Sequence, residues 1–277
     1  IVETVAVWRV ILVRRTIQAV SERDAAAFFD LDRTLIAGAS TFIFGWVAWK
    51  RGLLSTRELL GAATDALVFR LTGGSDDQPE KVRERILQAV AGQRREDLTA
   101  LNDDILPRLL AEVRPETRRV VERHHEAGRD TYIVSASPIE IVDPLGSALG
   151  MTGVIATESE VVDGVYTGRL LSEFCYGPGK AQRVQHLAET KGYDLRLCYA
   201  YSDSRSDLPL LELVGHPVAV NPDATLRREA RIRNWPVVHF ARRAKLTATA
   251  IGSGVAAASM GAGLYALGRV HGKRATG

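Results

Sequence analysis

The sequence AAAFFDLDRTL at positions 25–35 places two acidic residues directly after a short apolar run. Residues 25–29 have the length and composition of a buried strand, and this run ends abruptly at Asp30. In parallel α/β sheets, ligands bind at the carboxyl ends of the strands. Asp30 and Asp32 are therefore expected to lie at the ligand-binding edge of such a sheet.

Three further apolar runs, at residues 131–134, 197–201 and 217–220, resemble the first. Helical-period or turn-rich sequence separates them, which is typical of parallel strands in an α/β layer. The length of 277 residues suits one domain with an insertion. We therefore predict an α/β fold with a Rossmann-like parallel sheet core, formed by residues 25–39 and 114–240.

Residues 40–113 contain no convincing strand, but several helical segments that glycines interrupt. This region is predicted to be a helical cap inserted after the first strand. Farther on, Asp163-Gly164 lies between two β-prone runs, which is a strong signal for a hairpin. Residues 1–24 mix apolar residues with arginine and suit either a basic amphipathic helix on a membrane surface or an ordinary packing helix.

Apolar residues make up 46% of the chain and charged residues 25%, which is the balance of a globular protein rather than a disordered one. The formal net charge is only +3, and arginine-rich patches near both ends fit anionic lipid or phosphate partners. No nucleic-acid partner is predicted, and the oligomeric state is left open. Cys175 and Cys198 offer neither a disulfide framework nor metal-ligand spacing, so a reducing compartment is expected.

The acidic pair suits a phosphoryl transfer, in which one carboxylate is the nucleophile and the other donates a proton to the leaving oxygen and then activates water. Because a dianionic phosphate repels two carboxylates, the site also needs a hard cation and a fixed positive side chain. Lys180 can supply the positive charge, and Ser135 can bind a phosphate oxygen at the start of the following helix. Asp203 and Asp207, which follow the run at 197–201, would complete an oxygen-rich metal site.

Taken together, these motifs resemble the haloacid dehalogenase-like hydrolases, and within them the phosphoserine phosphatase-like branch of the subfamily IB type. The resemblance covers roughly residues 25–240. It rests on DLDRTL at 30–35, IVSAS at 133–137, GPGK at 177–180, YSDSRSD at 201–207 and GHPVAVNP at 215–222. Any one of these motifs is weak, but the ordered set is specific.

This resemblance implies a phosphomonoester substrate, Mg²⁺ as cofactor, and a cap that closes over the substrate. Asp30 would be the nucleophile and a metal ligand, and Asp32 the acid/base with its backbone carbonyl on the metal. Asp203 would be the third protein ligand, and Asp207 would orient the metal site. The phosphate would be held by Thr34, Ser135, Ala136 and Lys180.

The sequence departs from the phosphoserine-specific pattern, in which an acidic residue shortly after the nucleophile holds the substrate amine. This chain has Gly38, Ala39 and Ser40 there, with further departures at Ala136 and Ser206. The substrate is therefore predicted only as a small or amphiphilic phosphomonoester. The aromatic stretch 41–49 could receive an apolar tail, although aromatic residues at helical spacing more often form the core of a cap.

Residues 246–268 contain no charged residue, and at a rise of ~1.5 Å per residue this segment could span a membrane as a transmembrane helix. A disordered tail and a soluble docking helix are the alternatives. Arg9, Arg14 and Arg15 leave no signal-peptide core in the residues shown, so the catalytic domain is expected in the cytoplasm, with the C-terminal segment as a candidate membrane anchor.

Other interpretations exist for each feature. A lone Asp-x-Asp pair is usually a solvated turn, Ser135 alone could be a helix cap, and Lys180 alone a surface charge. His124 and His125 lie in a charged helical stretch that is predicted to be a solvated face rather than a metal site. Besides hydrolysis, the alternatives are phosphoryl transfer to another acceptor through the same aspartyl-phosphate, or a membrane adaptor that has lost turnover.

Overall fold

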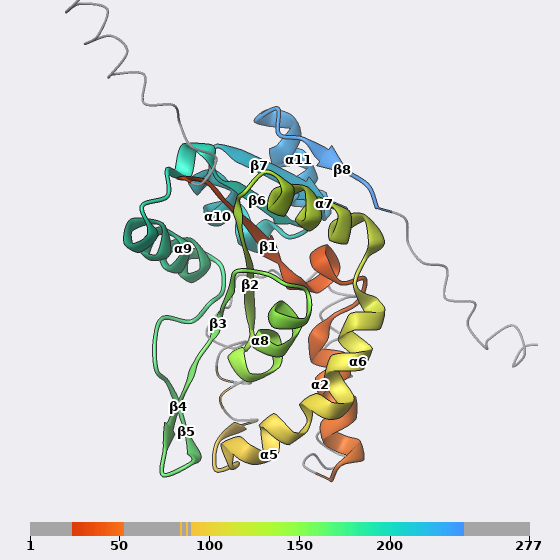
Figure 1. Ribbon diagram of the computed structural model, residues 1–277, viewed down its shortest axis with the longest axis vertical. Helices are drawn as coiled ribbons and strands as arrows, with labels where there is room; N and C mark the ends of the chain where they lie inside the picture. Colours follow the sequence, from red (N-terminus) through yellow and green to blue (C-terminus); the bar gives the residue numbers. More distant parts are fainter. Residues whose placement is uncertain (1–23, 53–83, 85–86, 88–89, 241–277) are drawn as a thin grey trace, which may run out of the picture. The chain divides into compact units, whose positions relative to one another are not determined.

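The computed structural model describes residues 24–52, 84, 87 and 90–240, and Figure 1 shows its ribbon. The predictions for residues 1–23 and 246–268 therefore fall outside the described residues. Within the described part of the chain, no helix has the length and apolar character needed to cross a membrane. The membrane association of the C-terminal segment stays a prediction.

A six-stranded parallel sheet forms the core, in the order β3-β2-β1-β6-β7-β8 (Figure 1). Its strands are β1 (Ala26–Asp30), β2 (Asp130–Pro138), β3 (Gly153–Thr157), β6 (Tyr199–Ser202), β7 (His216–Val220) and β8 (Val237–Val238). Each neighbouring pair is parallel. The predicted α/β fold with a parallel sheet is confirmed.

The observed strands begin one or two residues from the predicted runs, β2 continues four residues beyond its run, and the sheet has six strands rather than four. The run at 197–201 yields a strand only from Tyr199, because Leu195–Leu197 form a 3₁₀ turn, η3. The side chain of Asp194 caps this turn by accepting a hydrogen bond from the backbone N–H of Arg196 at 3.0 Å. The short edge strands β3 and β8 were not predicted.

Helices cover both faces of the sheet. They are α2 (Ser40–Lys50), α5 (Arg95–Ala100), α6 (Asn102–Glu112), α7 (Pro115–Glu126), α8 (Ile139–Ala148), α9 (Pro178–Lys191), α10 (Leu208–Leu213) and α11 (Ala224–Ile232). Side chains alternate along β1, so Phe29 belongs to the core cluster that includes residues of α2, α6, α7 and α8. Phe28 belongs to a second cluster that includes residues of α9, α10 and α11. This central strand is buried on both faces, which explains its continuous apolar run.

The hairpin predicted at Asp163-Gly164 is present. Strands β4 (Ser159–Val162) and β5 (Val165–Leu170) pair antiparallel, with Val162 opposite Val165. Asp163 and Gly164 both have positive φ, 49° and 79°, as a tight two-residue hairpin turn requires. The hairpin also contacts the start of the segment before α5, where Gly92 N–H donates to the carbonyl of Tyr166 at 2.9 Å.

The described part of residues 40–113 carries α2, α5 and α6, so its regular structure is helical. Its role as a cap stays a prediction. Three aromatic side chains of α2, Phe42, Trp46 and Trp49, are 62%, 39% and 38% exposed, so they do not form the interior that aromatic residues at this spacing usually form. The buried residues of this helix are Ser40, Val47 and Ala48.

His124 of α7 is buried, which corrects the predicted solvated face. Its ring lies edge-on to Phe29, Tyr199 and Tyr201. Arg129 can only donate to Nδ1, at 3.3 Å, so Nε2 carries the proton and donates to the hydroxyl of Tyr201 at 2.9 Å. Burial first, and then the charge of Arg129, lower the pKa of His124 to about 4 from its usual 6.5.

The buried neutral imidazole predicts a pH-dependent stability. Between about pH 6.5 and 4 the unfolded chain binds a proton at His124 that the folded chain does not, so stability is complete above this window and is lost as the pH falls through it. His124→Gln should reduce the drop in unfolding free energy between pH 7 and 4 by about 2 kcal/mol. Urea unfolding at both pH values measures this difference. The same change at the exposed His186 is the control, and an equal drop in His124→Gln and the wild type would contradict the prediction.

Candidate active site

The acidic pair follows β1 at the carboxyl edge of the sheet, as predicted. Asp30 is the last residue of β1, and residues Leu31–Leu35 form one wide turn, η2, that the hydrogen bond from Ile36 N–H to the carbonyl of Leu31 closes at 3.0 Å. Inside this turn Arg33 has φ 61°, a left-handed conformation that is uncommon for a residue with a side chain. Asp30, at the end of β1, and Asp32, in the turn that follows, therefore lie at the same edge of the sheet.

Lys180 reaches Asp30 from α9. Pro178 begins this helix after Gly177, which has φ 53°, and a Cβ at Gly179 would lie 2.0 Å from the carbonyl oxygen of Phe174. This close approach, possible only for glycine, seats the first turn of α9 against the preceding loop. Lys180 Nζ then donates to Asp30 Oδ1 at 2.5 Å and to Asp207 Oδ2 at 2.9 Å.

The ammonium group of Lys180 is almost fully buried. Burial by itself would lower the pKa of Lys180, but the charges of Asp207 and Asp30 more than offset it, so the pKa is raised and the side chain stays charged. It is thus a fixed positive charge between two carboxylates.

Asp203 and Asp207 follow the end of β6, next to β1. Asp207 closes the 3₁₀ turn η4 (Arg205–Asp207), and its Oδ2 also accepts a hydrogen bond from the hydroxyl of Ser202 at 2.7 Å. Asp203 is 6% exposed, and its Oδ2 pairs with Nε of Arg33 at 2.9 Å. Both acids therefore lie at the edge of the sheet where β1 ends.

The carboxylates of this site outnumber the cations that are buried with them. Burial, opposed by Lys180, raises the pKa of Asp30 to about 7. Burial and the neighbouring Asp30 raise the pKa of Asp203 to about 8. Oδ1 of Asp207 has no hydrogen-bond partner among the described residues. A hard divalent cation with oxygen ligands fits such a set, because it would favour the charged form of the acids.

The side chain of Asp32 contacts the start of α2 rather than Lys180. Its Oδ1 accepts the backbone N–H of Ser40, the first residue of α2, at 2.7 Å, and the hydroxyl of Ser40 lies 2.8 Å from that of Ser137. Within the described residues, no group of three or more His, Cys, Asp or Glu side chains is placed to hold a metal ion. Two acidic side chains and the backbone carbonyl of Asp32 remain compatible with the predicted ligand set.

The predicted phosphate-binding residues come from three elements at this edge, with Thr34 in η2, Ser135 and Ala136 in β2, and Lys180 in α9. Ser135 is buried inside β2, which continues to Pro138, so it does not begin a helix as predicted; its Oγ accepts the N–H of Ser137 at 3.1 Å. The carbonyl of Ala136 accepts a hydrogen bond from Thr157 at 2.7 Å. Oγ1 of Thr34 is buried and has no hydrogen-bond partner in the described structure, so it can donate to a ligand.

Sequence reasoning missed three residues that hold these acids. They are Arg33, Ser40 and Ser202. Ser202 and Arg33 belong to the recognised motifs, but the sequence of a motif does not indicate which carboxylate each residue contacts. Ser40 was noted only as a departure from the phosphoserine pattern.

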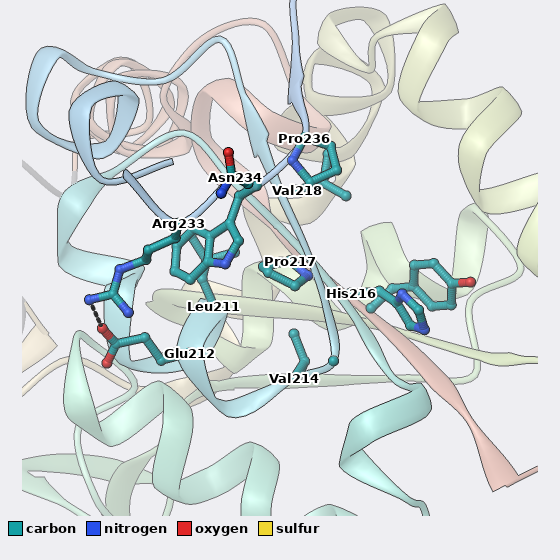
Figure 2. Close-up of a pocket in the computed structure, with 12 residues that line it drawn as sticks. Leu211, Glu212, Val214, His216, Pro217, Val218, Arg233, Asn234 and Pro236 are labelled. Atoms are coloured by element: carbon teal, nitrogen blue, oxygen red, sulfur yellow. Dashed lines mark ion pairs between the residues drawn. The ribbon is translucent and has the colours of Figure 1, made fainter. Parts of the chain in front are cut away.

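Figure 2 shows a pocket of about 480 Å³ that lies away from this site. Tyr199 and His216, the first residues of β6 and β7, line it together with Pro217, and the ion pair between Arg233 and Glu212 borders it. The pocket is thus at the amino ends of the strands, whereas Asp203 follows the carboxyl end of β6. We assign it no part in the chemistry.

The fold and the site define an α/β protein with buried acidic residues at the carboxyl edge of its parallel sheet. The family model described as haloacid dehalogenase-like hydrolase matches residues 27–212, and the chain belongs to this family. It is 42% identical over 258 residues to a probable phosphatase of Mycobacterium tuberculosis, a match that covers 87% of this chain and 88% of the relative. It is 37% identical to the phosphoserine phosphatase SerB1 of the same organism, with 88% and 80% covered.

A protein of unknown function from Bordetella pertussis has a solved structure that matches with a TM-score of 0.68 and 30% identity, over 77% of this chain and 97% of that one. The chain is a phosphoric monoester hydrolase of the phosphoserine phosphatase-like type. The predicted family and enzyme class are confirmed, whereas the roles of individual residues stay predictions.

Proposed function

We propose that this phosphatase is magnesium-dependent and acts through an aspartyl-phosphate on Asp30. The observation that carries the proposal is the buried contact of Lys180 Nζ with Asp30 and Asp207, beside Asp203. A charged lysine held 2.5 Å from a carboxylate can lower the repulsion between that carboxylate and an incoming phosphate. The acidic pair alone could not do so.

In the first step, a carboxylate oxygen of Asp30 attacks phosphorus while the bond from phosphorus to the substrate oxygen breaks. Asp32 donates its proton to the departing oxygen, so an alcohol leaves. In the second step, Asp32 takes a proton from water, and the water oxygen attacks phosphorus. The bond between phosphorus and Asp30 breaks, which releases inorganic phosphate and regenerates the Asp30 carboxylate. The pKa of Asp32 is raised by burial, which suits a carboxyl group that must carry a proton.

The neighbouring residues would bind the phosphate and the cation. Lys180 and the otherwise unbonded hydroxyl of Thr34 would contact phosphate oxygens, with Ser135 and the backbone at Ala136 on the adjacent strand end. Asp30, Asp203 and the backbone carbonyl of Asp32 would hold Mg²⁺, and Asp207 would keep Lys180 in place. When bound, the cation supplies charge neutralisation for the transferring phosphoryl group.

The substrate is proposed to be a small or amphiphilic phosphomonoester. The exposed aromatic side chains of α2 are consistent with an apolar substituent. The phosphoserine-specific pattern has an acidic residue near position 38 that binds the substrate amine, and this chain has glycine there. A carboxylate nevertheless lies close by, because a Cβ at Gly38 would be 3.9 Å from Oε2 of Glu112. Phosphoserine, the substrate in the name of the relative SerB1, therefore belongs in the same comparison.

A screen of phosphomonoesters tests the proposal. Phosphoserine and alkyl phosphates of short and long chain should be assayed with Mg²⁺ and after removal of metal by EDTA. We expect phosphate release to fall at least about a hundredfold without metal and to return when Mg²⁺ is restored. Equal activity with and without EDTA would contradict the metal dependence. Equal rates for the short and long alkyl phosphates would rule out the proposal that the substrate is amphiphilic.

The proposal also places the catalytic domain in the cytoplasm, with membrane association through residues 246–268, which rests on the sequence alone. Sedimentation of the full chain with the membrane fraction would support this part. Recovery of the full chain in the soluble fraction would contradict it.

A further inference from the structure

Arg33 has a contact that the proposed chemistry does not use. Its Nε donates to Oδ2 of Asp203 at 2.9 Å, and Arg33 lies in η2, the turn that follows Asp30 and contains Asp32. Arg33 holds a left-handed backbone conformation at φ 61°, and its N–H donates to the carbonyl of Gly38 at 3.0 Å. The closed turn thus aims the side chain across the sheet edge, from the end of β1 to the end of β6.

The two partners of this ion pair have unequal surroundings. The side chain of Arg33 is 61% exposed, whereas that of Asp203 is 6% exposed. If the pair separates, the guanidinium enters water at little cost, but the buried carboxylate is left without a cation. A charged Asp203 therefore needs a positive partner, and Arg33 is a partner that can leave.

Lys180 is the opposite case. It is 4% exposed and contacts Asp30 and Asp207 together, so it has no solvent to move into. Of these two cations, only Arg33 can exchange for an incoming ion. A divalent cation bound to Asp203 would lie within a few ångströms of the guanidinium, where like charges repel.

We propose that Arg33 neutralises Asp203 in the metal-free protein and competes with the divalent cation for this carboxylate. Arg33 is then a positioning residue that weakens apparent Mg²⁺ affinity and leaves Asp203 when the cation binds. The inference rests on the proposed function, in which Asp203 is a ligand of Mg²⁺. It assigns to Arg33 a role that is separate from phosphate binding.

Calorimetric titration of the full chain with Mg²⁺, without substrate, tests the proposal. Arg33→Gln should tighten the Mg²⁺ dissociation constant by about three- to tenfold, since one charged competitor is removed from a partly exposed pair. Arg33→Lys keeps the charge and should remain near the wild type. A second readout is the rise in melting temperature on adding Mg²⁺, which should be larger for Arg33→Gln than for the wild type.

The matched control is Arg196→Gln, because Arg196 also pairs through Nε with an aspartate, Asp194, but does so on the surface away from the site. It should leave Mg²⁺ binding unchanged. Unchanged or weaker binding in Arg33→Gln would overturn the inference, because an arginine that merely oriented Asp203 would support the metal rather than oppose it.

The wild type and Asp203→Asn separate this inference from the proposed function. If the wild type shows no saturable Mg²⁺ binding, or if Asp203→Asn binds as well as the wild type, the proposed metal site is wrong and the inference falls with it. If the wild type binds, Asp203→Asn does not, and Arg33→Gln matches the wild type, the metal site stands and only the role of Arg33 is rejected.

Discussion

Replacement of Asp30 by asparagine should reduce kcat by about 10⁴-fold or more, because the amide cannot form the bond to phosphorus on which both steps depend. The change keeps the size of the side chain at the end of β1, and Lys180 retains Asp207 as a partner at 2.9 Å. The variant should therefore fold. Quenching the reaction with radiolabelled substrate should trap a phosphorylated protein in the wild type and none in Asp30→Asn.

Asp32→Asn distinguishes the nucleophile from the acid/base. Asp32 contacts Ser40 rather than Lys180, so its removal leaves the attacking group intact. With a substrate whose leaving group needs no proton, Asp32→Asn should still form the phosphorylated protein and should hydrolyse it slowly. Asp143→Asn, on the exposed side of α8, is the control for a change of charge and should match the wild type. Turnover in Asp30→Asn near the wild-type rate would exclude Asp30 as the nucleophile.

The central part of the fold could be predicted because its signal is local. β1 is buried on both faces, so its apolar residues are continuous, and Asp30 ends the run where the chain reaches the ligand-binding edge. The edge strands gave no comparable signal. β8 has only two residues, Val237–Val238, which are too few to show a pattern. β3 is as long as β1, but only three of its residues, Val154 to Ala156, form an apolar run.

The burial of His124 could have been predicted from the spacing of residues in its helix. Thr117, Val121 and His124 are the buried residues of α7, and their spacing of four and three places them on one side of a helix. The charged residues between them suggested a solvated face. Helical spacing was thus a better guide to burial here than local composition.

In the candidate site, the residues on strand ends could be predicted but their contacts could not. The order of motifs along the chain indicates that Asp30 and Asp203 belong to one site, since parallel strands end at the same edge. Lys180 lies in the first turn of α9, and the motif that contains it indicated its place in the site. Which carboxylate each cation contacts depends on distances that only the folded turns determine. The pairing of Arg33 with Asp203, and of Ser40 with Asp32, is information of this kind.

Lys180→Met should damage both stability and activity, because one ammonium group contacts two buried carboxylates. It leaves Asp30 and Asp207 buried side by side without the ammonium that contacts both. Loss of one partner from a buried ion pair costs about 3–5 kcal/mol, and loss of the charge that faces the phosphate should lower kcat by about 10²–10³-fold. Urea unfolding and steady-state assays on the folded fraction measure the two effects. Lys191→Met, at the exposed end of the same helix, is the control.

The double variant Lys180→Met/Asp207→Asn separates the structural contribution of Lys180 from its part in the reaction. In the double variant only Asp30 remains as a buried carboxylate without the ammonium, rather than Asp30 and Asp207 together. Part of the lost stability should therefore return. Activity should not return, because the phosphate would still meet Asp30 without a neighbouring cation. If the double variant regained activity together with stability, Lys180 would serve only to hold the fold, and the charge balance assigned to it in the reaction would be wrong.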